Sequence, residues 1–429
     1  MSVLLFHPSV AIFVQQVARS LLEAGQLERF ITTVLDEPRS IRQRLICAAG
    51  RLGGRDLGAQ FRRRRLTEIP IEKVEAHPWG ELMRLATAAV DRDGRATDFV
   101  WEKTELAFDR LVARRLNRGL RAVYGWEHSS LATFQRAREL GVAVVYDVPA
   151  PETRFVQKLL AAEIEKFPEL RTAYHRHTAV REDRRTARRR AEWDAADVIL
   201  VNSQFTKNSY EQAGLDCSRV RVANLGAPPP VSREQALAAK SPARPLTLLW
   251  AGTFSIRKGA HYLLEAWRSG RLGLHARLRI FGSNALPDRT LHPLPEGIEF
   301  HGSIPRDELL RQYGDADALI FPTLCDGFGM VVTEAWSRGV PVITTDRAGA
   351  ADLLRSGNNG MLIRAADPAA IIEAVAWCHD HRPELQAMRE TALATAAAWQ
   401  WHDYRRLHAS ILRDAGLFGV RPAVVASKP

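Results

Sequence analysis

Cysteine is scarce in this sequence of 429 residues, and its spacing excludes two common kinds of site. The four cysteines, at positions 47, 217, 325 and 378, include no CxxC pair and lie near no histidine cluster. Neither a disulfide framework nor a structural zinc site is therefore encoded. A reducing cytoplasm is the compartment that fits this cysteine usage.

The sequence also lacks a long apolar run. The stretch "MSVLLFHPSVAIFVQQVARSLLEAG" has no basic segment, and His7, Gln15 and Gln16 interrupt its apolar residues. The run is well short of a signal peptide or a membrane-spanning helix. We therefore expect a cytoplasmic protein that is soluble or bound peripherally at the inner face of a membrane.

Lysine is rare in the sequence. Only eight of the 60 basic residues are Lys, and the others are Arg. The net charge is +11, and residues 39–65 alone carry nine Arg against one Asp. A second stretch, "REDRRTARRR", places four arginines on one helical face: Arg181, Arg184, Arg185 and Arg188. These stretches are interpreted as solvated faces, as a surface for an anionic membrane or charged acceptor, or as a nucleic-acid surface. The sequence has no helix-turn-helix, zinc-finger or RNP-like pattern to support nucleic acid.

The order of apolar runs predicts an α/β protein with two doubly wound domains. Hydrophobic residues make up 46% and charged residues 25%, which is a globular composition. Short apolar runs alternate with segments of helical period, as in parallel sheets with crossover helices. In the first half the predicted strands are Val3–His7, Phe30–Leu35, Ala122–Trp126, Val142–Asp147 and Asp197–Asn202. A helix is predicted over Leu131–Leu140.

The alternation restarts after a proline-rich stretch, "GAPPPVSREQALAAKSPARP", which is typical of a linker. The predicted strands are then Leu246–Gly252, Ala276–Gly282, Ile298–Gly302, "ALIFP" and "PVITT". We predict a first domain over 1–227, a linker over 228–245, a second domain over 246–393, and a C-terminal helix and tail over 394–429. In parallel sheets ligands bind beyond the carboxyl ends of the strands, so the two domains are expected to face each other across a cleft.

The loop after "ALIFP" contains the main candidate site. Gly327 and Gly329 allow its backbone to approach a ligand closely, and a helix is expected to begin near Met330. The helix start offers free N–H groups and a positive dipole end to an anion. Glu334, about one turn in, suits the paired hydroxyls of a ribose, while Asp326 would reach another part of the same ligand.

A second anion site is predicted in "GTFSIRKG". Arg257 and Lys258 end this loop, and two adjacent cations beside a helix start suit a diphosphate. Taken alone, an Arg–Lys pair is usually solvated, and an acid in the first turns of a helix is an ordinary dipole partner. The combination carries more weight, because both loops follow strands of one predicted sheet.

These residues resemble a known family. The segments "GTFSIRKGAHYLLEAW", "FHGSIPRDELLRQYGDADALIFPT" and "DGFGMVVTEAWSRGVPVITTDRAGAADLLRSGNNGMLI" are similar to the C-terminal domain of the retaining GT-B glycosyltransferases of family 4, the glycosyl transferases group 1. The resemblance is close over Leu246–Ile363 and looser over "EWDAADVILVNSQFTKNSYEQAGL", "RVRVANLGA" and the tail "WQWHDYRRL". It implies two Rossmann-like domains, with the tail returning to the first domain.

The resemblance also implies roles for individual residues. The family has two acids separated by seven residues, usually both Glu; here the first is Asp326, which would contact the transferred sugar, and the second is Glu334, which would bind the ribose. The remaining donor-site residues that it implies are Ser255, Arg257, Lys258, Ser303, Ile304, Gly327, Phe328, Gly329 and Met330. Two departures stand out: Thr253 replaces a common Arg, and "HPSVAIF" replaces a glycine-rich first loop.

The implied activity is transfer of a sugar, a hexose, from a nucleotide diphosphate-sugar to a glycan, lipid-linked or small-molecule acceptor, with retention of configuration. We see no DxD-type metal site to argue for, so no metal and no cofactor are expected; the cations and the helix dipole would offset the charge of the leaving diphosphate. Acceptor-positioning candidates follow strands of the first domain: Glu127, His128 and Asp147. For each of these, a capping or satisfied polar role is the alternative.

Two other functions fit parts of the sequence. A GT-B sugar-nucleotide epimerase would keep the fold and change the reaction. A membrane-docked binding protein on a degenerate glycosyltransferase scaffold would use the Arg-rich stretch at 39–65, and the presence of all four donor-site charges argues against it. Polysaccharide biosynthesis is the process that we expect for the enzyme.

Overall fold

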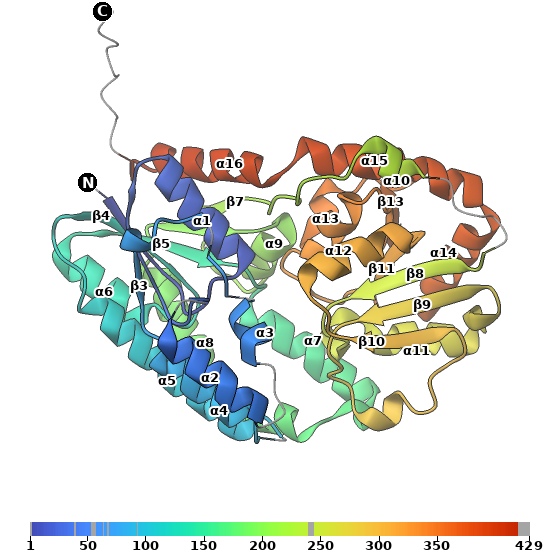
Figure 1. The fold of residues 1–429 in the computed structure, drawn as a ribbon, viewed down its shortest axis with the longest axis horizontal. Helices are drawn as coiled ribbons and strands as arrows, with labels where there is room; N and C mark the ends of the chain where they lie inside the picture. Colours follow the sequence, from blue (N-terminus) through green and yellow to red (C-terminus); the bar gives the residue numbers. More distant parts are fainter. Residues whose placement is uncertain are drawn as a thin grey trace, which may run out of the picture. The chain divides into compact units, whose positions relative to one another are not determined.

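The computed structural model describes residues 2–37, 40–52, 57–62, 64–66, 68–91, 93–238 and 244–418. Two sheets organise these residues (Figure 1). The seven strands of the first sheet have the order β3-β2-β1-β4-β5-β6-β7. Their bounds are β1 Ser2–Phe6, β2 Leu27–Thr32, β3 Val74–Ala76, β4 Leu120–Trp126, β5 Ala143–Val148, β6 Val198–Val201 and β7 Val220–Val222.

The second sheet has six strands in the order β10-β9-β8-β11-β12-β13, and every neighbouring pair is parallel. Their bounds are β8 Leu246–Ala251, β9 Ala276–Phe281, β10 Ile298–Gly302, β11 Ala318–Phe321, β12 Val342–Thr345 and β13 Gly360–Ile363. The four residues of β11 are all fully buried, as expected for a parallel strand that is covered on both faces.

Helices connect these strands. Those before the second sheet are α1 Ile12–Glu23, α2 Ile41–Leu52, α3 Leu57–Arg62, α4 Trp79–Ala88, α5 Arg95–Ala113, α6 Leu131–Leu140, α7 Thr153–Lys166, α8 Ala173–Ala195, α9 Gln204–Gln212 and α10 Arg233–Leu237. The later ones are the short 3-10 helix η3 Ile256–Lys258, α11 Ala260–Ser269, α12 Arg306–Asp315, α13 Met330–Trp336, α14 Pro368–Asp380, α15 Arg382–Ala398 and α16 Trp401–Asp414.

The described residues divide into two compact units. The first takes those within 1–148, 173–200 and 405–429, and the second takes those within 149–172 and 201–404. Helix α7 belongs to the second unit because Ile164, and Leu170 just after the helix, are part of that unit's hydrophobic core. From Arg405 onward α16 belongs to the first unit, where His408 Nδ1 lies 2.9 Å from Ser20 Oγ. The sequence-based boundaries at 227, 245 and 393 stay predictions.

Each strand predicted from the sequence corresponds to an observed strand, displaced by up to three residues at its ends. Strands β3, β7 and β13, which have three or four residues each, were not predicted. The proline-rich stretch contains one short helix, α10, whose Ala236 is buried. Within the described part of the chain, no helix is both long and apolar enough to cross a bilayer.

Candidate functional site

The two predicted donor loops meet at the carboxyl edge of the second sheet. Strand β8 leads into the first loop and β11 into the second, and these strands are parallel neighbours. The carbonyl oxygen of Arg257 accepts hydrogen bonds from the backbone N–H of Leu324 (3.0 Å) and from Thr323 Oγ1 (3.3 Å). Gly259 allows a further close approach, because a Cβ there would lie 2.0 Å from the carbonyl oxygen of Pro322.

Lys258 and Asp326 form an ion pair between these loops. Lys258 Nζ lies 3.0 Å from Asp326 Oδ2, and the two side chains are 15% and 14% exposed. The ammonium also lies over the ring of Phe321, 5.0 Å from its centroid. Burial alone would raise the pKa of Asp326, but the charges of Lys258 and Arg257 hold it below its ordinary value. Asp326 is therefore a carboxylate at neutral pH.

The backbone of Asp326 is fixed by the segment after β12. Its N–H donates to the carbonyl oxygen of Arg347 (2.9 Å), and its own carbonyl accepts from the N–H of Gly349 (3.1 Å). The N–H of Phe328 donates to Asp326 Oδ1 at 3.3 Å. These bonds leave the short side chain little freedom, so its direction is set by the loop.

Helix α9 holds the next residue, Gly327. Ser203 Oγ and Thr206 Oγ1 donate to the carbonyl oxygen of Gly327 at 2.5 and 3.2 Å. A Cβ on Gly327 would lie 1.9 Å from the carbonyl oxygen of Pro149, and a Cβ on Gly349 would lie 1.9 Å from the carbonyl oxygen of Gly327. The glycines at 327 and 349 are thus required by close packing of the chain against itself. Approach of the Gly327 backbone to a ligand stays a prediction.

Helix α13 begins at Met330, where the sequence predicted it, after Gly329 in the left-handed region (φ 81°). Glu334 on this helix is 6% exposed. Arg306 Nε donates to Glu334 Oε1 (2.9 Å) and the hydroxyl of Tyr313 donates to Oε2 (3.3 Å). Burial and the charge of Glu334 raise the pKa of Tyr313 well above its usual range. A ribose at Glu334 would share a carboxylate that already has two partners.

Arg306 and Tyr313 are site residues that the sequence analysis missed. A signal for them exists, since both lie on α12 seven residues apart and therefore on the same helical face. The other predicted donor residues lie around the same sheet edge: Ser255 before η3, Ser303 and Ile304 after β10, and Phe328 in the loop before α13. Ser303 is exposed and Ile304 half-buried, whereas Phe328 is buried.

His128 and Asp147 belong to the first unit. His128 follows β4 with φ 73°, an unusual value for a residue other than glycine, and it is 3% exposed. Its ring stacks on Trp101 with centroids 4.8 Å apart. The backbone N–H of His128 donates to Glu192 Oε2 (2.7 Å). Neither ring nitrogen has a hydrogen-bond partner among the described residues. Burial, together with nearby arginines, lowers the pKa of His128 to about 3, so the ring is neutral.

Asp147, at the end of β5, accepts a hydrogen bond from the hydroxyl of Tyr124 (2.7 Å). Burial raises the pKa of Asp147 to about 7, against the opposing effect of that hydrogen bond. The hydroxyl of Tyr124 also lies 3.2 Å from His408 Nε2 on α16. The observed partners of Asp147 are those of a satisfied buried group, and its role at an acceptor stays a prediction.

The arginine face of α8 pairs with acids of α5. Arg185 is 5% exposed and donates to Asp98 (2.8 Å) and Glu102 (2.9 Å). Arg184 pairs with Glu102 and Arg188 with Asp109. These arginines therefore have partners within the unit.

In the 39–65 stretch, Arg64 pairs with Glu81 (2.6 Å), while Arg39, Arg55 and Arg63 lie outside the described residues.

Residues 245–381 match a family model described as glycosyl transferases group 1. The putative colanic acid biosynthesis glycosyltransferase WcaL of Salmonella typhimurium is 26% identical over 192 residues, which cover 42% of this chain and 47% of that protein. The D-inositol 3-phosphate glycosyltransferase of Corynebacterium urealyticum is 28% identical over 233 residues, or 49% of this chain and 55% of that protein. The chain thus matches about half the length of these relatives.

Two solved structures are similar over nearly their whole length. Sucrose-phosphate synthase from Thermosynechococcus elongatus has a TM-score of 0.63 at 17% identity, covering 96% of this chain and 98% of the other. HepE from Anabaena, solved in complex with UDP-glucose, has a TM-score of 0.59 at 14% identity, covering 96% and 100%. At such identities the likeness shows the fold, and it confirms the predicted GT-B architecture of two Rossmann-like domains.

Proposed function

We propose that this chain, whose residues 245–381 match the glycosyl transferases group 1 family model, transfers a sugar from a nucleotide diphosphate-sugar to an acceptor hydroxyl. The observation that carries the proposal is the pairing of Lys258 with Asp326, 3.0 Å apart, at the sheet edge where Glu334 also lies. A cation for a diphosphate, an acid for a sugar and an acid for a ribose are the groups that such a donor needs.

The donor is proposed to lie along this edge. Arg257 and Lys258 bind the diphosphate, and Glu334 binds the ribose hydroxyls. Ser303 and Ile304 contact the base, while Asp326 contacts a hydroxyl of the transferred sugar. Support comes from the structures of Anabaena HepE with UDP and with UDP-glucose, which share this fold. The choice among uracil, guanine and adenine is left to experiment.

The reaction is proposed to retain the anomeric configuration. The acceptor oxygen forms a bond to the anomeric carbon on the face from which the diphosphate oxygen departs. The proton of the acceptor hydroxyl passes to the departing diphosphate, so no strong base of the protein is required. Arg257 and Lys258 stabilise the charge that grows on the diphosphate, which is electrostatic catalysis without a bound metal.

A glycan or a lipid-linked sugar is the acceptor that we favour. The relatives from Salmonella typhimurium and Escherichia coli are named for colanic acid biosynthesis, which supports polysaccharide biosynthesis as the process. A cytoplasmic enzyme in peripheral contact with an anionic membrane would meet such an acceptor. Two exposed apolar residues on α4 support the contact: Trp79 is 70% exposed and Met83 is 55% exposed, one turn apart.

Calorimetric titration with UDP, GDP and ADP in the presence of a chelator tests this proposal. We expect one of the three to bind selectively. Comparing that nucleotide with its 2′-deoxy form then tests Glu334, because wild type should prefer the ribose form and Glu334→Gln should lose most of the preference. Asp307→Asn, an exposed acid on α12, is the matched control. Binding of none of the three nucleotides would overturn the donor assignment.

A further inference from the structure

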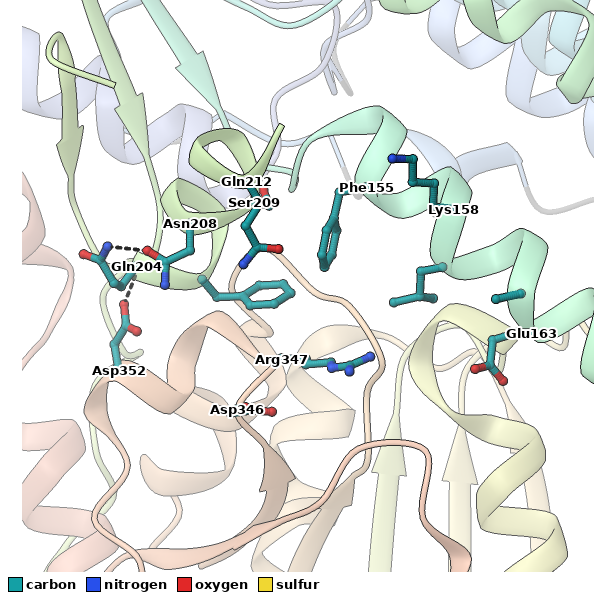
Figure 2. Close-up of a pocket in the computed structure, with 13 residues that line it drawn as sticks. Phe155, Lys158, Glu163, Gln204, Asn208, Ser209, Gln212, Asp346, Arg347 and Asp352 are labelled. Atoms are coloured by element: carbon teal, nitrogen blue, oxygen red, sulfur yellow. Dashed lines mark hydrogen bonds between the residues drawn. The ribbon is translucent and has the colours of Figure 1, made fainter. Parts of the chain in front are cut away.

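A cavity of about 660 Å³ lies within the second unit, and none of the residues assigned above to the donor lines it (Figure 2). Helix α7, helix α9 and residues 346–352 form its walls. In Figure 2 the ring of Phe155 and the guanidinium of Arg347 point into the space between these three segments. A volume of this size suits a small organic ligand.

One wall presents amide groups at regular spacing. Gln204, Asn208 and Gln212 are four residues apart on α9 and therefore lie along one face of the helix. Gln204 Nε2 donates to Asn208 Oδ1 at 2.7 Å, which leaves the amide nitrogen of Asn208 for a ligand. Within the described residues, the side chain of Gln212 has no hydrogen-bond partner. Amides both donate and accept, as a sugar hydroxyl does.

The cavity also has an aromatic part. The rings of Phe155 on α7 and Phe205 on α9 meet edge to face, with centroids 5.9 Å apart. Both rings line the cavity. An aromatic surface beside amides suits a pyranose ring, which has an apolar C–H face and hydroxyls around its rim.

The charges of the walls favour a neutral ligand. Lys158 and Arg347 are offset by Glu163, Asp346 and Asp352. Asp352 accepts from the N–H of Gln204 and from Asn224 Nδ2, each at 2.8 Å, and Glu163 lies 3.0 Å from His261. The cavity therefore has no excess of cations that would select a phosphate.

Two walls of the cavity also hold the loop of Asp326. Ser203 and Thr206, at the start of α9, bind the carbonyl oxygen of Gly327, while the carbonyl oxygen of Arg347 accepts the N–H of Asp326. The walls of the cavity are thus hydrogen-bonded to the loop that carries Asp326, the acid that we assign to the transferred sugar. This adjacency relates the cavity to the transfer reaction.

We propose that the cavity binds a neutral sugar unit of the acceptor, next to the position of transfer. The proposal rests on the proposed function for its biological meaning, but sugar binding is measurable by itself. Saturation-transfer NMR on the full chain is the experiment, with a set of neutral hexose and N-acetylhexosamine methyl glycosides as probes, with and without UDP. The test variant is Asn208→Leu/Gln212→Leu, and the control is Glu211→Leu, which replaces an exposed residue of the same helix.

We expect at least one glycoside to receive saturation from wild type and from Glu211→Leu. The double variant should show a loss of about tenfold, as for two lost hydrogen bonds. An unchanged signal in the double variant, or no signal in wild type under either condition, would overturn the sugar site. Nucleotide binding is read separately: wild type that binds glycosides but no nucleotide would contradict the donor proposal and leave the sugar site standing.

Discussion

Neutralising Asp326 should tighten nucleotide binding, although this acid is assigned to the sugar. In the structure Lys258 Nζ is 3.0 Å from Asp326 Oδ2, so the carboxylate offsets the charge that we expect to bind the diphosphate. Asp326→Asn keeps the shape of the side chain and removes its charge. Lys258 is then left to the diphosphate alone, and the repulsion between two anions disappears.

The geometry sets the size of both effects. A charge-assisted hydrogen bond contributes about 1.5–3 kcal/mol, so Lys258→Met should weaken binding of the selected nucleotide diphosphate by about 10- to 150-fold. A diphosphate oxygen beyond Lys258 would lie about 6 Å from Asp326, where two unit charges repel by about 3 kcal/mol at an effective dielectric constant of about 20. Screening by salt and the lost orientation of Lys258 reduce this repulsion energy, and we expect Asp326→Asn to bind the selected nucleotide diphosphate about tenfold more tightly.

Calorimetry of the nucleotide that wild type selects is the assay, at constant ionic strength. Asp346→Asn is the control, because it removes an exposed acid that follows a strand of the same sheet and should change the affinity little. An unchanged affinity in Lys258→Met would refute the diphosphate role of Lys258. Weaker binding in Asp326→Asn would refute the repulsion argument and show that the acid's main effect is to hold Lys258 in position.

Three further predictions concern stability and surface binding. The pKa of Asp147 is raised to about 7, so Asp147→Asn should stabilise the protein at pH 8, by up to about 4 kcal/mol, and not at pH 4. Gly349→Ala should cost about 1–3 kcal/mol of stability because its Cβ would meet the carbonyl oxygen of Gly327, whereas Gly314→Ala, with open space around it, should be harmless. Trp79→Ser should weaken sedimentation with phosphatidylserine vesicles by about tenfold.

The sign of the pH effect at Asp147 follows from linkage. The folded protein keeps this proton up to about pH 7, while the unfolded chain loses it near the ordinary pKa of 3.8, so the folded state loses stability as the pH rises between these values. Thermal unfolding at pH 4 and pH 8 measures it, and parallel pH profiles for wild type and variant would contradict it. For the vesicles, the control is Leu274→Ser, which replaces an apolar residue that is 62% exposed and lies outside α4. Equal loss of vesicle binding in both variants would speak against docking through α4.

Local pattern in the sequence was sufficient to predict most of the strands and the start of α13. Strand β11 is an unbroken apolar run, and the two glycines around Phe328 mark where the chain leaves the strand and enters the helix. The four charged donor candidates were likewise found from their place after strand ends. Such features depend on residues that are neighbours in the chain, which is why sequence alone reveals them.

Contacts between distant segments were not predictable in the same way. Glu334 is held by Arg306 and Tyr313 from α12, which requires knowing how α12 and α13 pack. The arginine face of α8 was recognised as a helical face, but its interpretation as exposed missed the acids on α5. The sequence analysis did not use the spacing of Asp98 and Glu102, which are four residues apart and therefore lie on one face of α5.

The pairing of Lys258 with Asp326 gives a reason for coupling between the two parts of the donor. A buried charge without a partner is costly, so in the absence of donor each of these residues satisfies the other. A diphosphate supplies Lys258 with a second anion, and the carboxylate then has capacity for a hydroxyl of the sugar. We infer that the diphosphate and the sugar should bind cooperatively. Because the backbone of Asp326 is held on both sides, by Arg347 and Gly349, we expect this exchange of partners to leave the loop in place.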